Sequence, residues 1–338
     1  MRIPFFINFL PIFIHNWKFR KKLLLPLYRF KQQEMEKRCS AKHGFTEKTI
    51  VYMVLPETTF SGGLSDRLRG ITSIYAECKR QGLPFRIVFE PLRLTDYLAP
   101  NRYDWQISEE DIIWDVDRCY PCSLLTFHSD LNNPLQRFAQ KMILRFYIGH
   151  RAQQIHVYSN MATEDNRFGA LFHELFKPSN DLQNYIDEHL LRLGGDRRYI
   201  AMTFRFRQLL GDFKEGGETL PQNSRESYIN RCIASIERLH GKHSEERILV
   251  TSDSSTFLNR LLKDVRTKDY VYIIPGQVVH IGFTFDAHKE TYMKSFVDFF
   301  MLGHAKQIFL MRDKKMYHSG FPYRASLLYG SKYSEIYI

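Results

Sequence analysis

Cysteine is scarce in this sequence, and it forms no pattern of a known site. Five cysteines are an odd number in a chain of 338 residues, so we expect no disulfide framework and a reducing compartment is favoured. Cys119 and Cys122 form a C-x-x-C pair, but no second pair and no nearby Cys/His pair completes a tetrahedral zinc site. We therefore predict an ordinary buried or turn pair and no metal.

The glycine-rich motifs of two large nucleotide-binding classes are also absent. No stretch reads G-x-x-x-x-G-K-[S/T], which disfavours a P-loop nucleoside triphosphatase. The stretch "SGGLSDRLRG", residues 61–70, departs from G-x-G-x-x-G, so a nicotinamide cofactor is not indicated.

The amino end lacks an apolar run long enough to span a membrane. Residues 3–14 are interrupted by two prolines and an asparagine, and they are shorter than the roughly 20 residues that a spanning helix needs. The basic residues follow this run and no small-residue cleavage site appears, which disfavours a secretory signal. Residues 1–45 are predicted to be a basic, apolar segment. Residues 1–38 would touch an anionic membrane surface or pack on the body of the protein.

Positive charge is plentiful, but it is concentrated at the same end. Residues 1–38 hold nine basic and two acidic side chains, and so they carry +7 of the formal +11. A nucleic-acid-binding protein would spread a basic stripe over a folded face. We therefore expect no nucleic-acid partner, and a cytoplasmic protein that lies at the inner face of the membrane if the amino end binds lipid.

Apolar strands and amphipathic helices alternate in two series, and the length exceeds one usual domain. In the first half, strands are predicted at 49–56, 84–90, 111–115, 123–128 and 154–159, and helices at 64–81 and 134–149. After a helix from residue 178, the second half has predicted strands at 198–206, 247–251, 270–274 and 307–311. This order predicts an α/β fold with mostly parallel sheets. The two Rossmann-like domains, 46–195 and 196–338, would face each other across a cleft.

Three loops at strand ends of the second half carry concentrated polar side chains. The first holds Arg205, Arg207, Asp212 and Glu215, the second holds Asp253 and Ser254, and the third holds Ser319 and Phe321. Each loop has a structural explanation as a helix N-cap or an ion pair. Together they indicate a crevice for a phosphorylated ligand, because helix N-termini and arginines bind phosphate at this edge of a sheet.

Four short motifs in order, "SGGLSDRLRG", "FRFRQLLGDF", "TSDS" and "SGFPYRASLL", give the sequence a resemblance to a family. They are similar to motifs of the GT-B fucosyltransferase superfamily, which includes bacterial nodulation, α-1,2-, α-1,6- and protein O-fucosyltransferases. The resemblance implies inverting transfer of fucose from GDP-fucose to a glycan, without a metal or a cofactor. A surface polysaccharide or lipid-linked glycan would suit the amino end as acceptor.

The resemblance also implies roles for single residues. Arg205 matches the arginine of an H-x-R motif that binds the donor diphosphate, and Asp253 with Ser254 matches a motif that contacts the nucleoside. Ser319 with Phe321 matches an S-x-F-S motif that lines the phosphate and base. Gly62 and Gly63, followed by Asp66 and Arg67, match the amino-terminal loop. Thr203 replaces the histidine of H-x-R, and Pro322 replaces the final serine of S-x-F-S. Asp212 or Glu215 is the favoured base.

Two alternatives remain open from the sequence. Asp115 and Asp117 in "IIWDVD" match the D-x-D pattern with which metal-dependent GT-A glycosyltransferases hold a divalent cation. Thr203 and Pro322 also allow a non-catalytic protein that binds a nucleotide sugar. Binding of GDP-fucose without turnover on any glycan would indicate the second. A manganese-dependent activity that is lost in Asp115→Ala with Asp117→Ala would indicate the first.

Overall fold

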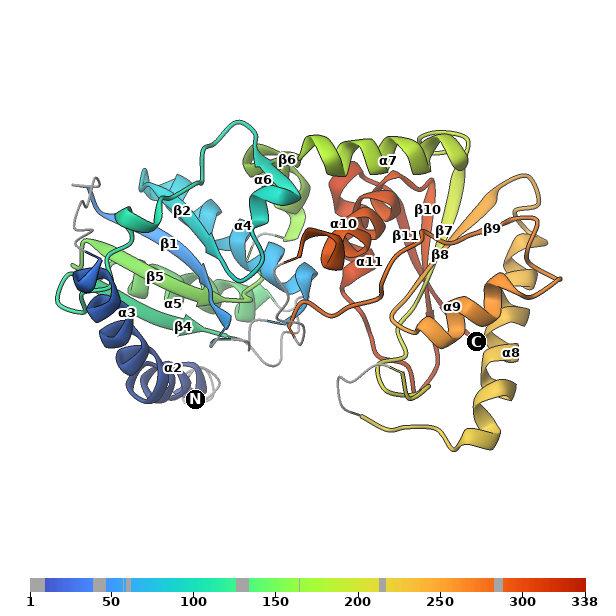
Figure 1. Cartoon of the computed structure of the whole chain (residues 1–338), viewed down its shortest axis with the longest axis horizontal. Helices are drawn as coiled ribbons and strands as arrows, with labels where there is room; N and C mark the ends of the chain where they lie inside the picture. The colour runs from blue at the N-terminus through green and yellow to red at the C-terminus, as the bar shows by residue number, and fades with distance from the viewer. Residues whose placement is uncertain are drawn as a thin grey trace. The chain divides into compact units, whose positions relative to one another are not determined.

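The computed structural model describes residues 10–38, 47–56, 58, 62–125, 134–163, 165–212, 217–282 and 288–338. It forms two compact units (Figure 1). Unit 1 comprises residues 1–91 and 100–176, and unit 2 comprises residues 92–99 and 177–338. The predicted domain bounds, 46–195 and 196–338, come from sequence pattern and stay a prediction.

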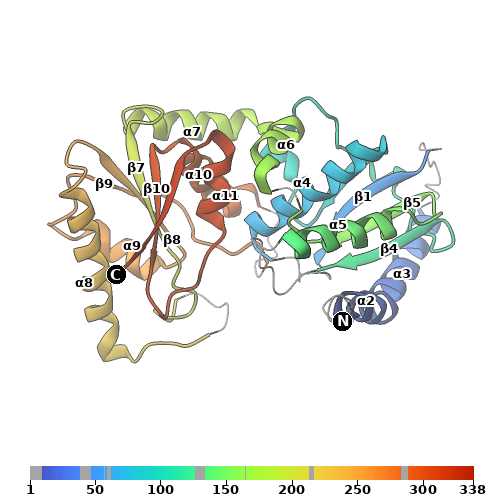
Figure 2. The same cartoon turned by 180° about the vertical axis from the view of Figure 1, so that it is seen from behind.

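Unit 1 is built on a parallel sheet with the strand order β2-β1-β5-β4. Its strands are β1 (Thr49–Val54), β2 (Phe85–Phe89), β4 (Cys119–Leu124) and β5 (Gln154–Ser159). Figures 1 and 2 show α4 (Leu64–Gln81) and α5 (Pro134–Ile148) on one face and α3 (Leu25–Lys37) on the other. Helix α6 (Phe168–Leu175) completes the unit, together with short 3-10 turns at 109–111 and 165–167.

The amino-terminal helices pack on unit 1 through part of their surface. Helix α2 (Leu10–Phe19) continues through a π-helical turn (Arg20–Leu24) into α3. The Tyr28 hydroxyl is fully buried and lies 2.7 Å from Nδ1 of His156 and 3.0 Å from the Tyr158 hydroxyl. The Ser123 backbone N–H of edge strand β4 donates to Asn16 Oδ1 of α2 at 2.7 Å. Among the described residues, no helix is long and apolar enough to cross a membrane.

One predicted strand of unit 1 is wrong. Residues 112–114 are buried but belong to no sheet, because the Ile113 N–H donates to the Gln154 side chain at 2.9 Å and the Trp114 ring packs against Tyr28. The neighbouring strand begins earlier than predicted, at Cys119. Cys119 and Cys122 lie buried in β4, as an ordinary pair, and burial raises the pKa of both thiols.

Unit 2 is built on a second parallel sheet with the order β11-β10-β7-β8-β9. Its strands are β7 (Tyr199–Phe204), β8 (Arg247–Ser252), β9 (Val271–Tyr272), β10 (Gln307–Arg312) and β11 (Lys332–Tyr337). Helices α8 (Gln222–His240) and α9 (Ser255–Leu262) lie on one face, and α10 (Lys289–His304) and α11 (Phe321–Tyr329) lie on the other (Figure 1). Parallel sheets covered on both faces are the expected α/β architecture.

Helix α7 (Asn180–Arg192) and the short segment 92–99 complete unit 2. The segment contains a 3-10 turn (Leu94–Asp96), and its Tyr97 ring stacks on Phe296 of α10 with centroids 4.3 Å apart. Strands β3 (Leu98–Pro100) and β6 (Phe176–Pro178) form a separate two-stranded sheet where the chain passes between the units.

Candidate functional site

The sheet of unit 2 brings the three predicted loops to one edge. Strand β7 lies between β8 and β10, with Phe204 opposite both Ser252 and Met311. All three strands are parallel, so the loops that follow them leave from the same carboxyl edge. The backbone confirms this proximity, because the Tyr317 N–H donates to the carbonyl oxygen of Arg205 at 3.1 Å.

Asp253 joins the first two loops through its hydrogen bonds. Its carboxylate accepts from Arg205 Nη1 at 2.8 Å and from the backbone N–H groups of Phe206 at 2.8 Å and Arg207 at 2.6 Å. The side chains of Arg205 and Asp253 are 15% and 6% exposed, so the ion pair is largely shielded from water. Burial raises the pKa of Asp253, and the Arg205 guanidinium and the two N–H groups oppose that rise.

Asp212 lies at the amino end of α9. One carboxylate oxygen accepts from Ser254 Oγ at 2.9 Å, from Ser255 Oγ at 3.2 Å and from the Thr256 N–H at 2.7 Å. Ser254 is the N-cap, since its hydroxyl accepts from the Phe257 N–H at 3.1 Å. A carboxylate here is stabilised by the helix dipole and by N–H groups that would equally bind a phosphate oxygen.

The third loop adds aromatic and cationic groups to the same edge. The Arg207 guanidinium lies 5.0 Å above the Tyr317 ring, and Arg207 holds a left-handed backbone with φ 53°. Ser319 is buried, and its hydroxyl accepts from the Phe321 N–H at 3.3 Å. Arg324 of α11 is 1% exposed, and a Cβ on Gly320 would lie 3.0 Å from its Nη1. The sequence places Arg324 directly after the third loop, in "YRASLL", but no site role was predicted for it.

The two departures from the family motifs have local explanations in the structure. The Thr203 hydroxyl lies 2.9 Å from that of Thr251, and both side chains are buried between β7 and β8. Pro322 occupies the first turn of α11, where a missing N–H leaves no helical hydrogen bond unmade. Both residues therefore stabilise the elements that carry the loops.

The glycine loop of unit 1 is held by its own helix. Gly62 has φ 81°, and a Cβ there would lie 2.5 Å from Oδ2 of Asp66. Gly63 is the N-cap of α4. The buried Arg67 donates from Nε to the Gly62 carbonyl at 3.0 Å, and its guanidinium lies 5.4 Å from the centroid of the Phe89 ring. These contacts fix the turn and place Asp66 in the first turn of α4.

The remaining predicted residues are placed as follows. Asp115 Oδ1 accepts from the Asp117 N–H at 2.9 Å, so this carboxylate closes a local turn. In the described ranges, no group of three His, Cys, Asp or Glu side chains is placed to hold a metal ion. Glu215 lies outside the described residues.

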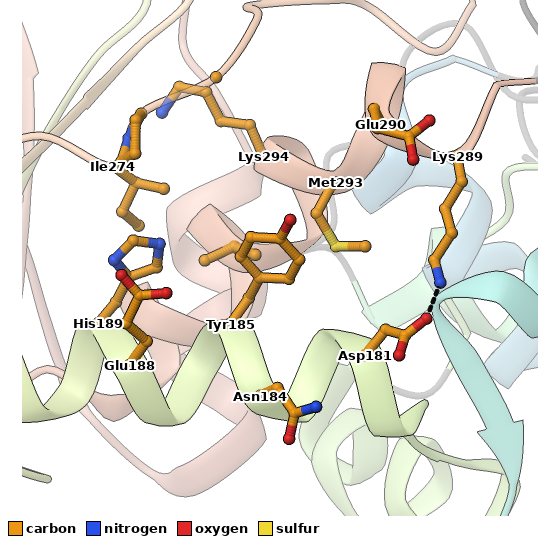
Figure 3. Close-up of a pocket in the computed structure, with 13 residues that line it drawn as sticks. Asp181, Asn184, Tyr185, Glu188, His189, Ile274, Lys289, Glu290, Met293 and Lys294 are labelled. Atoms are coloured by element: carbon orange, nitrogen blue, oxygen red, sulfur yellow. Dashed lines mark hydrogen bonds and ion pairs between the residues drawn. The ribbon is translucent and has the colours of Figure 1, made fainter.

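A pocket of 580 Å³ that the sequence did not predict lies between α7, α10 and the residues after β9 (Figure 3). Its lining is Asp181, Asn184, Tyr185, Glu188, His189, Ile274, Pro275, Gly276, Lys289, Glu290, Met293, Lys294 and Val297. Several charged groups are already paired. Lys289 contacts Asp181, and buried Lys294 lies 3.0 Å from Asp298. Nδ1 of His189 lies 2.7 Å from the Tyr272 hydroxyl. In the sequence, the only indication of this pair was a lysine and an aspartate four residues apart in the apolar run of α10.

Comparison with known proteins gives relatives by structure alone. No protein-family model matches the chain, and no curated protein matches it in sequence. The fucosyltransferase NodZ from Bradyrhizobium is 14% identical, with a TM-score of 0.51 over 84% of this chain and 94% of that one. The α-1,6-fucosyltransferase NodZ soaked with GDP-fucose is 13% identical, with a TM-score of 0.50 over 84% and 93%.

A mutant of Arabidopsis thaliana FUT1 in complex with GDP is 14% identical, with a TM-score of 0.54 over 91% of this chain and 74% of that one. At sequence identities this low, the comparison shows a shared fold and says nothing about the active sites. The predicted α/β class and the predicted resemblance are confirmed at that level: the chain has the fold of the GT-B fucosyltransferases.

Proposed function

We propose that this protein is an inverting, metal-independent fucosyltransferase that uses GDP-fucose. The observation that carries the proposal is the Arg205–Asp253 pair at the carboxyl edge of the unit 2 sheet, in a chain with the fold of enzymes whose structures were determined with GDP-fucose or GDP. The acceptor would be a surface polysaccharide or lipid-linked glycan, modified at the inner face of the cytoplasmic membrane.

Arg205 would stabilise the leaving group. When the bond between fucose C1 and the diphosphate oxygen breaks, negative charge develops on that oxygen, and a fixed guanidinium lowers the barrier. Asp253 orients Arg205 through the 2.8 Å ion pair and holds the following backbone at Phe206 and Arg207. Because the guanidinium is fixed before the donor binds, little reorganisation is needed during the reaction.

The N-terminal end of α9 and the third loop would complete donor binding. Ser254 is the N-cap of α9, and with Asp253 it is proposed to contact the nucleoside of the donor. Ser319 and Phe321 flank Gly320, the N-cap of α11, and Arg324 of this helix is buried. The Arg207 guanidinium lies 5.0 Å from the centroid of the Tyr317 ring. In unit 1, Gly62, Gly63, Asp66 and Arg67 are proposed to contact donor or acceptor.

The acceptor hydroxyl must lose a proton as its oxygen bonds to fucose C1, and a carboxylate would take that proton. Asp212 and Glu215 are the proposed bases. Three hydrogen bonds hold the Asp212 carboxylate at the amino end of α9. Asp212→Asn and Glu215→Gln therefore separate the two: the true base loses kcat while donor affinity is kept.

Titration calorimetry with GDP-fucose, GDP-mannose, GDP and UDP-glucose tests the donor. We expect heat with the guanine nucleotides and none with UDP-glucose, and product mass spectrometry with lipid-linked glycans should show addition of one deoxyhexose. Absence of heat with every guanine nucleotide would overturn the proposal. Binding without transfer to any glycan would identify a nucleotide-sugar-binding scaffold instead.

A further inference from the structure

Two helices of unit 1 expose large apolar side chains next to each other. Thirteen such side chains are exposed in the described part of the chain, and six of them lie on α2 and α5. We call these six the α2–α5 surface: Phe13, Ile14, Trp17, Phe138, Met142 and Phe146. The rings of Phe13 and Phe146 meet edge to face with centroids 6.0 Å apart, so the two helices contribute to one continuous patch.

Helix α5 is apolar on both sides. Phe138, Met142 and Phe146 recur every four residues and form one outward stripe, with exposures of 55%, 48% and 67%. The opposite side of the helix, which includes Ile143 and Leu144, is buried. A surface helix normally presents polar residues to water, so an outward stripe of this kind marks an interaction surface.

Exposed lysines adjoin the patch at its α2 end. Lys18, Lys21 and Lys22 are all exposed, and Nζ of Lys21 lies 5.3 Å from the centroid of the Trp17 ring. Trp17 is itself 61% exposed. Aromatic side chains flanked by lysines match the interface of an anionic bilayer, where rings enter the headgroup layer and lysines pair with lipid phosphates.

We propose that the α2–α5 surface docks on an anionic lipid bilayer, with Trp17 and Phe146 entering the headgroup layer and Lys18, Lys21 and Lys22 contacting lipid phosphates. The inference deepens the membrane location given under the proposed function, adds α5 to it, and does not depend on the donor. The charge complementarity of the lysines selects a bilayer over a second copy of this chain.

Tryptophan fluorescence provides a direct test on the full-length protein. The chain has three tryptophans, and Trp105 and Trp114 are only 3% and 5% exposed, so a change in polarity at the surface is reported by Trp17. We expect a blue shift and cosedimentation with vesicles that contain phosphatidylglycerol, and neither with phosphatidylcholine alone. Trp17→Phe should remove the shift while most of the sedimentation remains.

Matched variants distinguish vesicle binding by this surface from non-specific adsorption of the protein. Trp17→Ser with Phe146→Ser should weaken vesicle binding at least about tenfold, and Lys21→Gln with Lys22→Gln by about fivefold per lysine. Leu191→Ser with Leu262→Ser, and Lys242→Gln with Lys263→Gln, change exposed residues of unit 2 and should leave binding intact.

Three results would overturn the inference: no vesicle binding, equal losses in the unit 2 variants, or a blue shift that follows protein concentration without lipid. The last result would indicate self-association. Calorimetry with GDP-fucose on the same samples shows separately whether the donor proposal stands.

Discussion

In both units, arginines and an aspartate lie where the chain passes from a strand to the helix that follows it, but the partners of these charged groups differ. In unit 1, Arg67 and Arg69 donate to the backbone carbonyls of Gly62 and Asn160 at 3.0 and 2.7 Å, and the carboxylate that pairs with Arg69, that of Asp66, is 38% exposed. In unit 2, Arg205 faces the carboxylate of Asp253. An arginine held by carbonyls fixes the backbone, whereas one oriented by a buried carboxylate can present its charge to a ligand. The motif letters alone do not distinguish these two uses.

The largest expected difference concerns activity. Arg205→Lys keeps the charge but loses the planar fork, so we expect kcat/KM for GDP-fucose to fall at least about a hundredfold. Arg69→Lys should cost about 1–2 kcal/mol of the free energy of unfolding, through its lost bond to Asn160, and leave kcat nearly unchanged. Initial rates at saturating acceptor, with urea denaturation of each variant, check this. Equal losses of kcat in the two variants would contradict the comparison.

The next difference concerns stability. Asp253→Asn removes a buried charge that accepts from three donors, and we expect a loss of about 3 kcal/mol in the free energy of unfolding. Asp66 is 38% exposed and pairs with Arg69 at 3.3 Å, so Asp66→Asn should change stability by less than about 0.5 kcal/mol. Urea unfolding at neutral pH measures both, and similar values would remove the distinction between the loops.

Acid should destabilise the protein through the buried histidine of unit 1. Burial lowers the pKa of His156 to about 3 from its ordinary value of 6.5, so the unfolded chain binds the proton more tightly than the folded one. Stability is therefore lost as the pH falls below 6.5, by about 2 kcal/mol between pH 7 and pH 5. His156→Gln should flatten most of this slope. His189 in unit 2 is also buried and its pKa is also lowered, but the nearby Glu188 carboxylate opposes that fall, so His189→Gln should flatten the slope less.

The smallest effect distinguishes two left-handed glycines of unit 1. Gly62 and Gly82 have φ 81° and 66°, so alanine at either position should cost about 1 kcal/mol in strain. A Cβ at Gly82 meets nothing within 4 Å, whereas one at Gly62 would press on the Asp66 carboxylate. Thermal unfolding should show Gly62→Ala as the less stable variant. The reverse order would mean that Asp66 does not pack on the turn.

The alternation of strands and helices was predictable because strong local signals bound the elements. Helix α4 begins after Gly63 and ends at Gly82 in the left-handed conformation, as the sequence pattern predicted. Residues 112–114 mislead the same reasoning, since an apolar run is equally compatible with burial against Tyr28 outside any sheet. Strand β11 was missed because its residues are polar and its position at the sheet edge leaves them partly exposed.

The residues of the candidate site were predictable where polar side chains directly follow a buried strand. Arg205, Asp253 and Ser254 follow buried strands and were found for that reason. The hydrogen bonds from the α9 amino end to Asp212 depend on how two loops fold together, and no sequence period encodes that. The buried Lys294–Asp298 pair was missed because polar residues inside an apolar helix are expected to be exposed until the packing is known.

Asn16 has a consequence for the solubility of the chain. Strand β4 is an edge of the unit 1 sheet, and an unpaired edge is a template on which another chain can add a strand. Asn16 accepts a hydrogen bond from the Ser123 N–H, and helix α2 thereby covers part of that edge. A protein shortened to begin at residue 47 would lack this cover. Light scattering should then show aggregation through β4, even if the shortened protein remains folded.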